Sequence, residues 1–304
     1  MPVPDSLAAN PARLLAALLE PVIGQVYFSP ECHAGYQALG FAPSSGFAGQ
    51  VALPDGPAYF TSRGSVMGQV PGEVVAAAFA VFNPQAVIPS VTYGWTLTDA
   101  ATICRARDDG AVAQLRRVLG EAPDGAGRVA ELLARAVEPL RPEGRPLFAG
   151  VRSQPMPDDP LGRIWRCGDM LREFRGDCHT AAWISAGLDA TEIGLLSELY
   201  WGLPMKTYVR TRAWSDEQLD AAVERLRGRG WVDADGGFTP AGRSAREAVE
   251  DATDRQVQPA LAAVGDDAAE LFGLLAPWGA ALRAAGAYLP AGPHDLAAKL
   301  ATGA

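Results

Sequence analysis

The residues best suited to chemistry lie in one segment, Arg172-Glu173-Phe174-Arg175-Gly176-Asp177-Cys178-His179, the densest polar cluster of an otherwise apolar region. We expect Gly176 to break a helix and Asp177 to cap a new helix over 178–187. In the first turn of that helix the macrodipole would keep the His179 imidazole neutral, so that it could act as a base or a ligand. His179 and Asp177 are therefore the catalytic candidates, and a plain cap beside a packing residue is the alternative.

The same helix start would favour a thiolate at Cys178. However, adjacent residues on a helix point about 100° apart, which is a poor arrangement for a nucleophile and its base. Two Cys-His dipeptides, at Cys32 and Cys178, lack the paired ligand spacing of structural zinc sites. The sequence also holds no phosphate-binding, hydrolase or zincin motif in a supporting context. We therefore expect no metal and no cofactor.

Two arginines, Arg63 and Arg107, interrupt stretches of apolar or small residues and are candidates for guanidinium groups inside a pocket. The alternative for each is a structural ion pair that satisfies a buried charge, with Asp99, Glu73 or Asp177 as the partner. Around Arg63, aromatic residues and glycines supply the walls and the close backbone approach that a ligand site needs. The two interpretations stay open for both arginines.

We expect Arg63 and His179 to line one pocket, although they lie far apart in the sequence. Aromatic residues at helical spacing nearby are candidates for its walls, with core packing as the alternative. A helix cap is the alternative for Asn83, which precedes a proline. The predicted ligand-binding residues are Tyr59, Arg63, Phe79, Phe82, Asn83, Trp95, Arg107, Arg175 and His179.

The elements that would position these residues are mostly helices over the first part of the chain. Asn10-Pro11, Ser29-Pro30 and Asp159-Pro160 are typical helix starts, with a capping residue before a first-turn proline. Residues 58–64 fall in a stretch rich in glycine, proline and serine, where we expect an ordered loop or short strand. Residues 141–159 contain four prolines and are expected to form a linker.

The last third of the chain has the pattern of a winged helix. Ser215 and Gln218 form a capping box, so a helix should begin at 216 and end near Gly230. A turn over 233–237 follows, and a Thr239-Pro240 start predicts a long helix to about 262. Yet residues 191–260 hold nine Lys and Arg against twelve Asp and Glu. A DNA reader normally shows a basic footprint, because phosphate neutralisation supplies most non-specific affinity.

The helix, wing and helix order of the last third resembles the MarR-like winged helix-turn-helix module. A longer resemblance rests on residues spread along the chain: Tyr27-Phe28, Tyr59-Phe60, Arg63, Gly68, Val75, Phe79, Phe82-Asn83-Pro84, Trp95, Ala106-Arg107, Arg175-Gly176-Asp177, His179, Arg229-Gly230-Trp231 and Thr253-Asp254-Arg255. With these residues, nearly the whole chain resembles an actinobacterial family of two-domain proteins named for a helix-turn-helix and of largely unassigned function. In that family the position of Cys178 is usually glycine, so a thiol mechanism would not be a family mechanism.

The chain as a whole has 304 residues and a formal net charge of −9, which disfavours nucleic acids and anionic membranes as partners. It contains no run of eighteen apolar residues, and its N-terminus lacks the basic segment of a signal peptide, so a cytoplasmic location is expected. Four cysteines without a repeating spacing are expected to be reduced thiols.

We therefore predict a mainly α fold, with a helical, ligand-binding N-terminal domain over 1–188 and a winged-helix domain with a small β wing over 189–304. The first functional hypothesis is a protein that binds a small, largely apolar organic molecule, with the winged helix as a scaffold. The alternatives are a MarR-like, ligand-responsive regulator that binds DNA and an enzyme that uses His179 as acid or base. The apolar helix pattern over 266–288 favours a homodimer.

Overall fold

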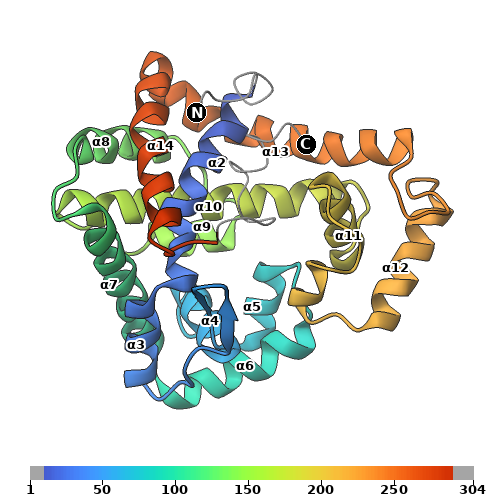
Figure 1. Ribbon diagram of the computed structural model, residues 1–304, viewed down its shortest axis with the longest axis horizontal. Helices are drawn as coiled ribbons and strands as arrows, with labels where there is room; N and C mark the ends of the chain where they lie inside the picture. Colours follow the sequence, from blue (N-terminus) through green and yellow to red (C-terminus); the bar gives the residue numbers. More distant parts are fainter. Residues whose placement is uncertain (1–9, 290–304) are drawn as a thin grey trace.

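The structure of this protein is a computed structural model that describes residues 10–289. Residues 1–9, on which the expectation about a signal peptide rests, lie outside the described part. The predicted mainly α fold is confirmed (Figure 1). The α-helices are α2 (Pro11–Gly24), α3 (Pro30–Ala38), α4 (Gly56–Gly64), α5 (Gly72–Phe79), α6 (Pro84–Leu97), α7 (Ala100–Leu119), α8 (Ala126–Val137), α9 (Pro146–Arg152), α10 (Pro160–Ser185), α11 (Ala190–Tyr200), α12 (Asp216–Gly228), α13 (Pro240–Val264) and α14 (Ala268–Ala284).

Short elements join these helices. Single helical turns of the 3₁₀ type are η1 (Gln25–Phe28), η2 (Ser65–Met67), η3 (Val209–Arg212) and η4 (Gly265–Asp267). Within the described residues the strands are β1 (Gly46–Ala48) and β2 (Val51–Leu53), an antiparallel pair in which Phe47 lies opposite Ala52. The predicted wing is smaller than a sheet, because Val232 and Phe238 form one isolated antiparallel bridge between α12 and α13.

Side-chain caps start the helices where the sequence predicted them. The side-chain oxygen of Asn10 accepts from the backbone amides of Ala12 and Arg13 at the start of α2. The Asp159 carboxylate accepts from the Gly162 amide at the start of α10. Ser215 and Gln218 form the expected reciprocal capping box at α12. Each cap satisfies an amide that has no partner inside its own helix.

Three local predictions were wrong. Residues 58–64 belong to helix α4, which is capped by Asp55 and has a proline in its first turn. The expected linker over 141–159 contains helix α9. Gly176 does not break a helix, because α10 runs without interruption from Pro160 to Ser185. A single glycine costs a helix only about 1 kcal/mol, and the burial of α10 on neighbouring helices outweighs that cost.

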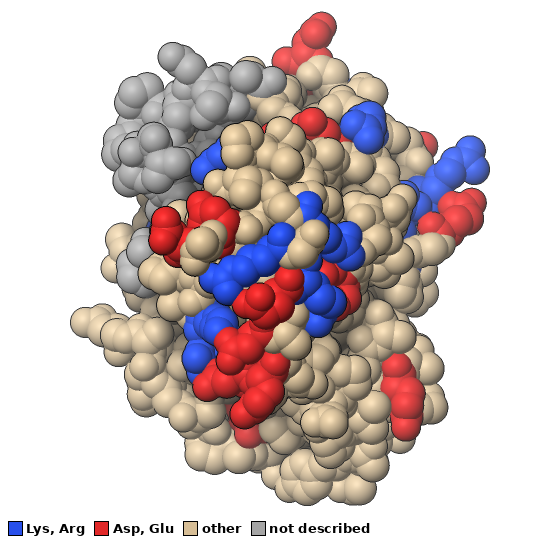
Figure 2. Space-filling model, turned by 90° about the vertical axis from the view of Figure 1, so that its right-hand side faces the viewer, with Lys and Arg blue, Asp and Glu red and all other residues tan. Residues whose placement is uncertain are grey.

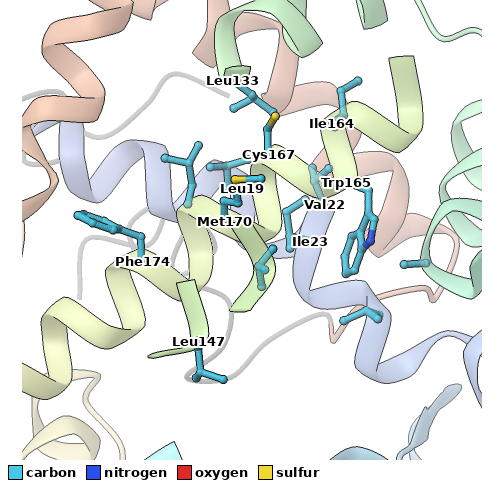
Figure 3. Close-up of a cluster of buried hydrophobic side chains, with 14 of the residues drawn as sticks. Leu19, Val22, Ile23, Leu133, Leu147, Ile164, Trp165, Cys167, Met170 and Phe174 are labelled. Carbon is cyan, nitrogen blue, oxygen red and sulfur yellow. The ribbon is translucent and has the colours of Figure 1, made fainter. Parts of the chain in front are cut away.

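Helix α10 lies at the centre of the larger hydrophobic core. Figure 3 shows its side chains Trp165 and Met170 among Leu19 and Ile23 of α2 and Leu133 of α8. This core also includes the second half of α13 and helix α14, which packs against α2. The buried positions along α10 therefore face several helices at once, which explains why its sequence shows no simple amphipathic stripe.

A smaller core joins the end of α10 to α11, α12 and the first half of α13, with Leu196, Leu219 and Val249 among its members. Helix α13 therefore takes part in both cores, and it runs beside α10 across Figure 1. The predicted division between 188 and 189 stays a prediction. However, the packing associates the last part of the chain, α14 included, with the first core.

Candidate functional site

A cavity of about 630 Å³ lies where the helical bundle meets the segment of α11 and α13. Its size is within the range of small-molecule pockets. Helices α2, α10, α11 and α13 supply most of its wall, and α4 and the segment between α11 and η3 complete it. The larger apolar side chains in the wall are Leu15, Leu19, Val81, Leu171, Ile193, Trp201 and Val257.

Arg63 and His179 both border this cavity, as does Arg175. The Arg63 guanidinium is held by Glu173, with Nε donating at 3.2 Å and Nη2 at 2.7 Å, and it stacks over the ring of Phe79. Burial alone would raise the pKa of Glu173, but the charges of Arg63 and Arg172 lower it to about 2. Arg63 is therefore an ion-pair partner of a buried carboxylate at the edge of the cavity.

A second polar network joins α10 to α13 and α2. The Arg175 Nη2 donates to Glu250 at 2.9 Å and to Asp254 at 3.2 Å. Arg246 lies 2.8 Å from Glu250, and Arg13 donates to Asp254 at 2.6 Å. Despite the burial of Glu250, Arg246 and Arg175 hold the pKa of its carboxyl far below its ordinary value. These charged groups of α2, α10 and α13 form an ion-pair network beside the cavity.

The hydrogen bonds of His179 define its tautomer. Its Nδ1 lies 3.2 Å from the hydroxyl of Thr253, and that hydroxyl donates its own hydrogen to the Val249 carbonyl at 2.8 Å. The Thr253 oxygen therefore accepts, so the proton sits on Nδ1 and Nε2 is an acceptor. Burial lowers the pKa of His179 to about 4, although Glu250 opposes this shift, so the imidazole is neutral at pH 7.

Asp177 does not start a new helix, because α10 runs through it, so the helix-dipole argument for His179 was wrong and burial replaces it. The Asp177 carboxylate accepts from the Phe148 amide at 3.0 Å and is not part of the cavity wall. Burial raises its pKa to about 7. Burial also raises the pKa of the Cys178 thiol, which lies inside the core beside Arg145. The expected thiolate at Cys178 is therefore not favoured.

The other predicted ligand residues lie outside the cavity wall. Tyr59, Phe79 and Phe82 belong to a cluster of aromatic rings. Asn83 caps α6 and donates to the Ala213 carbonyl at 2.9 Å. Trp95 donates to the Val70 carbonyl at 2.8 Å. These five side chains therefore have packing or capping partners within the chain.

Arg107 is one of the largest fully buried side chains. It makes a bidentate ion pair with Asp169, with both bonds at 2.8 Å, and stacks over Trp165. Arg107 therefore makes a structural ion pair, which was the alternative to a pocket role. Its partner Asp169 was not among the carboxylates proposed from the sequence.

Several wall residues were missed, among them Arg212, Arg243 and Arg246. One signal in the sequence could have located the α13 part: Arg246, Glu250 and Asp254 recur at intervals of four and so share one helix face. No group of three or more His, Cys, Asp or Glu side chains among residues 10–289 could hold a metal ion.

The basic side chains near α12 are paired with acids instead of forming a free surface. Lys206 contacts Asp220, and Arg210 contacts Asp216 at 2.6 Å. Figure 2 shows basic and acidic side chains interleaved on the side of the molecule where α12 lies. The remaining pairs are Arg227 with Glu224, Arg225 with Asp189 and Glu192, and Arg229 with Glu192. This arrangement leaves few cations ready for phosphates.

Comparison with known proteins adds the family. Residues 12–289 match a family described as "Helix-turn-helix family". The chain belongs to this family. No curated protein and no solved structure matches it. No helix in the described part of this helix-turn-helix family member is both long and apolar enough to cross a membrane.

Proposed function

We propose that this protein binds a small organic molecule in the cavity between the helical bundle and the segment of α11 and α13, and that this segment serves as one wall of the site. The observation that carries the proposal is the cavity of about 630 Å³ itself, whose wall combines apolar side chains with a group of arginines. A concave, largely apolar pocket of this size with a few polar groups is typical of small-molecule sites.

Gly176 allows a sharp test, because it borders the cavity and has room beside it. An added Cβ would come no closer than 4.0 Å to the Glu173 carboxylate. Gly176→Leu should therefore fill the cavity without removing a charged group, and a helix generally gains from losing a glycine. Gly273→Leu is the control, since Gly273 lies in α14, outside the cavity wall, with open space around its Cβ.

The experiment is native mass spectrometry of the protein isolated from the cells that make it. We expect one extra mass per chain in the wild type and in Gly273→Leu, and none in Gly176→Leu. An extra mass that persists in Gly176→Leu would contradict binding in this cavity.

A MarR-like regulator that binds DNA is the second candidate, and membership of a helix-turn-helix family favours it. The ion pairs of Lys206 and Arg210 with α12 oppose it, because phosphates would have to displace those carboxylates. A polarisation titration on genomic fragments at physiological salt tests this candidate. We expect no binding tighter than about 1 µM, the tight limit of typical non-specific affinity, and a stronger complex would favour the regulator.

A third candidate is catalysis, because the neutral His179 presents an acceptor nitrogen to the cavity. A general base needs such an unprotonated nitrogen within reach of its substrate. Incubation of the bound molecule with wild type and His179→Gln, followed by mass analysis, tests it. An unchanged molecule would reject catalysis and leave the binding proposal intact.

A further inference from the structure

The charge of the cavity wall differs from that of the whole protein. The chain has a net charge of −9, yet seven arginines and three glutamates line the cavity. The wall thus concentrates cations in an acidic molecule. The lining arginines are Arg13, Arg63, Arg172, Arg175, Arg212, Arg243 and Arg246.

Five of these arginines are matched by carboxylates. Arg13, Arg175 and Arg246 share the acids of α13, and Arg63 and Arg172 share Glu173 with a contribution from Glu20. Each of these carboxylates is occupied by at least one guanidinium. A charged ligand in the cavity therefore meets no unpaired carboxylate among the described wall residues.

Arg212 and Arg243 are different, because neither makes an ion pair with a carboxylate of the described residues. The Arg212 guanidinium lies over the rings of Phe82 and Tyr208, at 4.5 Å from each centroid, and it also donates to the Tyr208 hydroxyl. Arg243 lies over Phe238 at 5.2 Å. Stacking leaves the in-plane N–H donors of a guanidinium available for an anion.

Much of the remaining wall is apolar, with Leu15, Ile193 and Val257 among its members. Such a surface suits a hydrocarbon or aromatic body and gains free energy when it is covered. Together, the wall combines an apolar part with two unmatched cations.

We propose that the ligand is an organic anion with an apolar body, whose carboxylate, sulfonate or phosphate group pairs with one of the two unmatched guanidiniums, Arg212 or Arg243. This inference rests on the proposed function, since it names the class of molecule that the cavity takes. Neutral apolar molecules would fill the same space but leave the two cations unmatched. Organic cations would be repelled.

Two fluorescent probes with the same aromatic framework test the proposal: anilinonaphthalene sulfonate, which is an anion, and phenyl naphthylamine, which is neutral. Both are titrated into the full chain at physiological salt and read by fluorescence. We expect the anion to bind at one site per chain at least about tenfold more tightly than the neutral probe. Its affinity should fall as the salt concentration rises.

The test variant is Arg212→Gln combined with Arg243→Gln, which strands no carboxylate. We expect it to lose at least about tenfold in affinity for the anion and to keep its affinity for the neutral probe. The control is Arg141→Gln, an arginine that is 83% exposed and outside the cavity wall, which should bind both probes as the wild type does.

Each remaining outcome has a distinct meaning. Equal or tighter binding of the neutral probe, blocked by Gly176→Leu, would overturn the anion proposal and keep the binding function. Anion binding that survives the double substitution would also overturn it, since the probe would then sit elsewhere. If neither probe binds at a saturable site, the proposed function fails and the anion proposal fails with it.

Discussion

The Arg63–Glu173 pair shows how a buried charge at the cavity edge is kept. Glu173 is nearly inaccessible, with 2% of its side chain exposed, and it depends on Arg63 and Arg172 for compensation. We expect Arg63→Ala to lower the free energy of unfolding by about 3 kcal/mol, because it strands part of a buried carboxylate's charge. Urea denaturation measures this loss.

Arg212→Gln is the matched control for Arg63→Ala, since Arg212 has no carboxylate partner among the described residues. It should lose about 1 kcal/mol or less. If Arg63→Ala also loses no more than that and abolishes probe binding, Arg63 contacts the ligand directly and its pairing with Glu173 is secondary.

Asp177 should make stability depend on pH. Burial raises its pKa from an ordinary value of 3.8 to about 7, so the folded state holds the proton where the unfolded state has lost it. The stabilising contribution of the bound proton is complete below pH 3.8 and is lost as pH rises toward about 7, at up to about 1.4 kcal/mol per pH unit.

Asp177→Asn removes this titration, and its amide oxygen still accepts from Phe148. We therefore expect the variant to gain stability relative to the wild type between pH 5 and pH 8. Urea denaturation at both pH values measures the gain. An equal difference at both pH values would show that Asp177 titrates normally.

At the scale of residues, the sequence indicated which arginines lie in apolar surroundings but not which carboxylates pair with them. Arg63 and Arg107 were correctly singled out as buried or pocket guanidiniums, yet their partners are Glu173 and Asp169. Those carboxylates lie 110 and 62 positions away along the chain. Only the tertiary fold, which packs α10 against α7 and brings the long side chain of Arg63 on α4 to Glu173, joins such pairs. No local sequence pattern encodes it.

Helix starts were predictable, because caps and first-turn prolines act within four residues. Helix α4 was missed for the opposite reason: its residues favour turns, and the burial of Phe60 against Phe79 and Phe82 outweighs that preference. The continuity of α10 through Gly176 was missed in the same way. Tertiary burial decides where local propensity is weak or contrary.

Two helix glycines should respond in opposite directions to alanine. Gly110 of α7 lies against α3, where a Cβ would come within 2.6 Å of the Cys32 backbone nitrogen, so Gly110→Ala should destabilise the protein by about 1–3 kcal/mol through overpacking. Gly273 of α14 has open space, so Gly273→Ala should stabilise it by about 1 kcal/mol. Thermal unfolding of both variants checks the contrast, and a stabilising Gly110→Ala would contradict the close packing of α7 on α3.

For the whole molecule, the surface on which a dimer was predicted is occupied within the chain. Leu271, Leu275 and Leu282 of α14 are fully buried against neighbouring helices, and Leu274 is partly buried. Because this face is covered, we expect light scattering at micromolar concentration to give the mass of a monomer. A dimer mass would require a different interface.

The contacts of α2 with α14 and the residues after it have a consequence for synthesis on the ribosome. Helix α14 packs against α2, and the hydroxyl of Tyr288, which follows α14, donates to Glu20, translated 268 residues earlier. At typical elongation rates, α2 must wait roughly ten to fifty seconds for this segment to emerge. During that interval the part of α2 that packs on α14 has no permanent cover. The nascent chain is therefore expected to need chaperone protection until α14 is made.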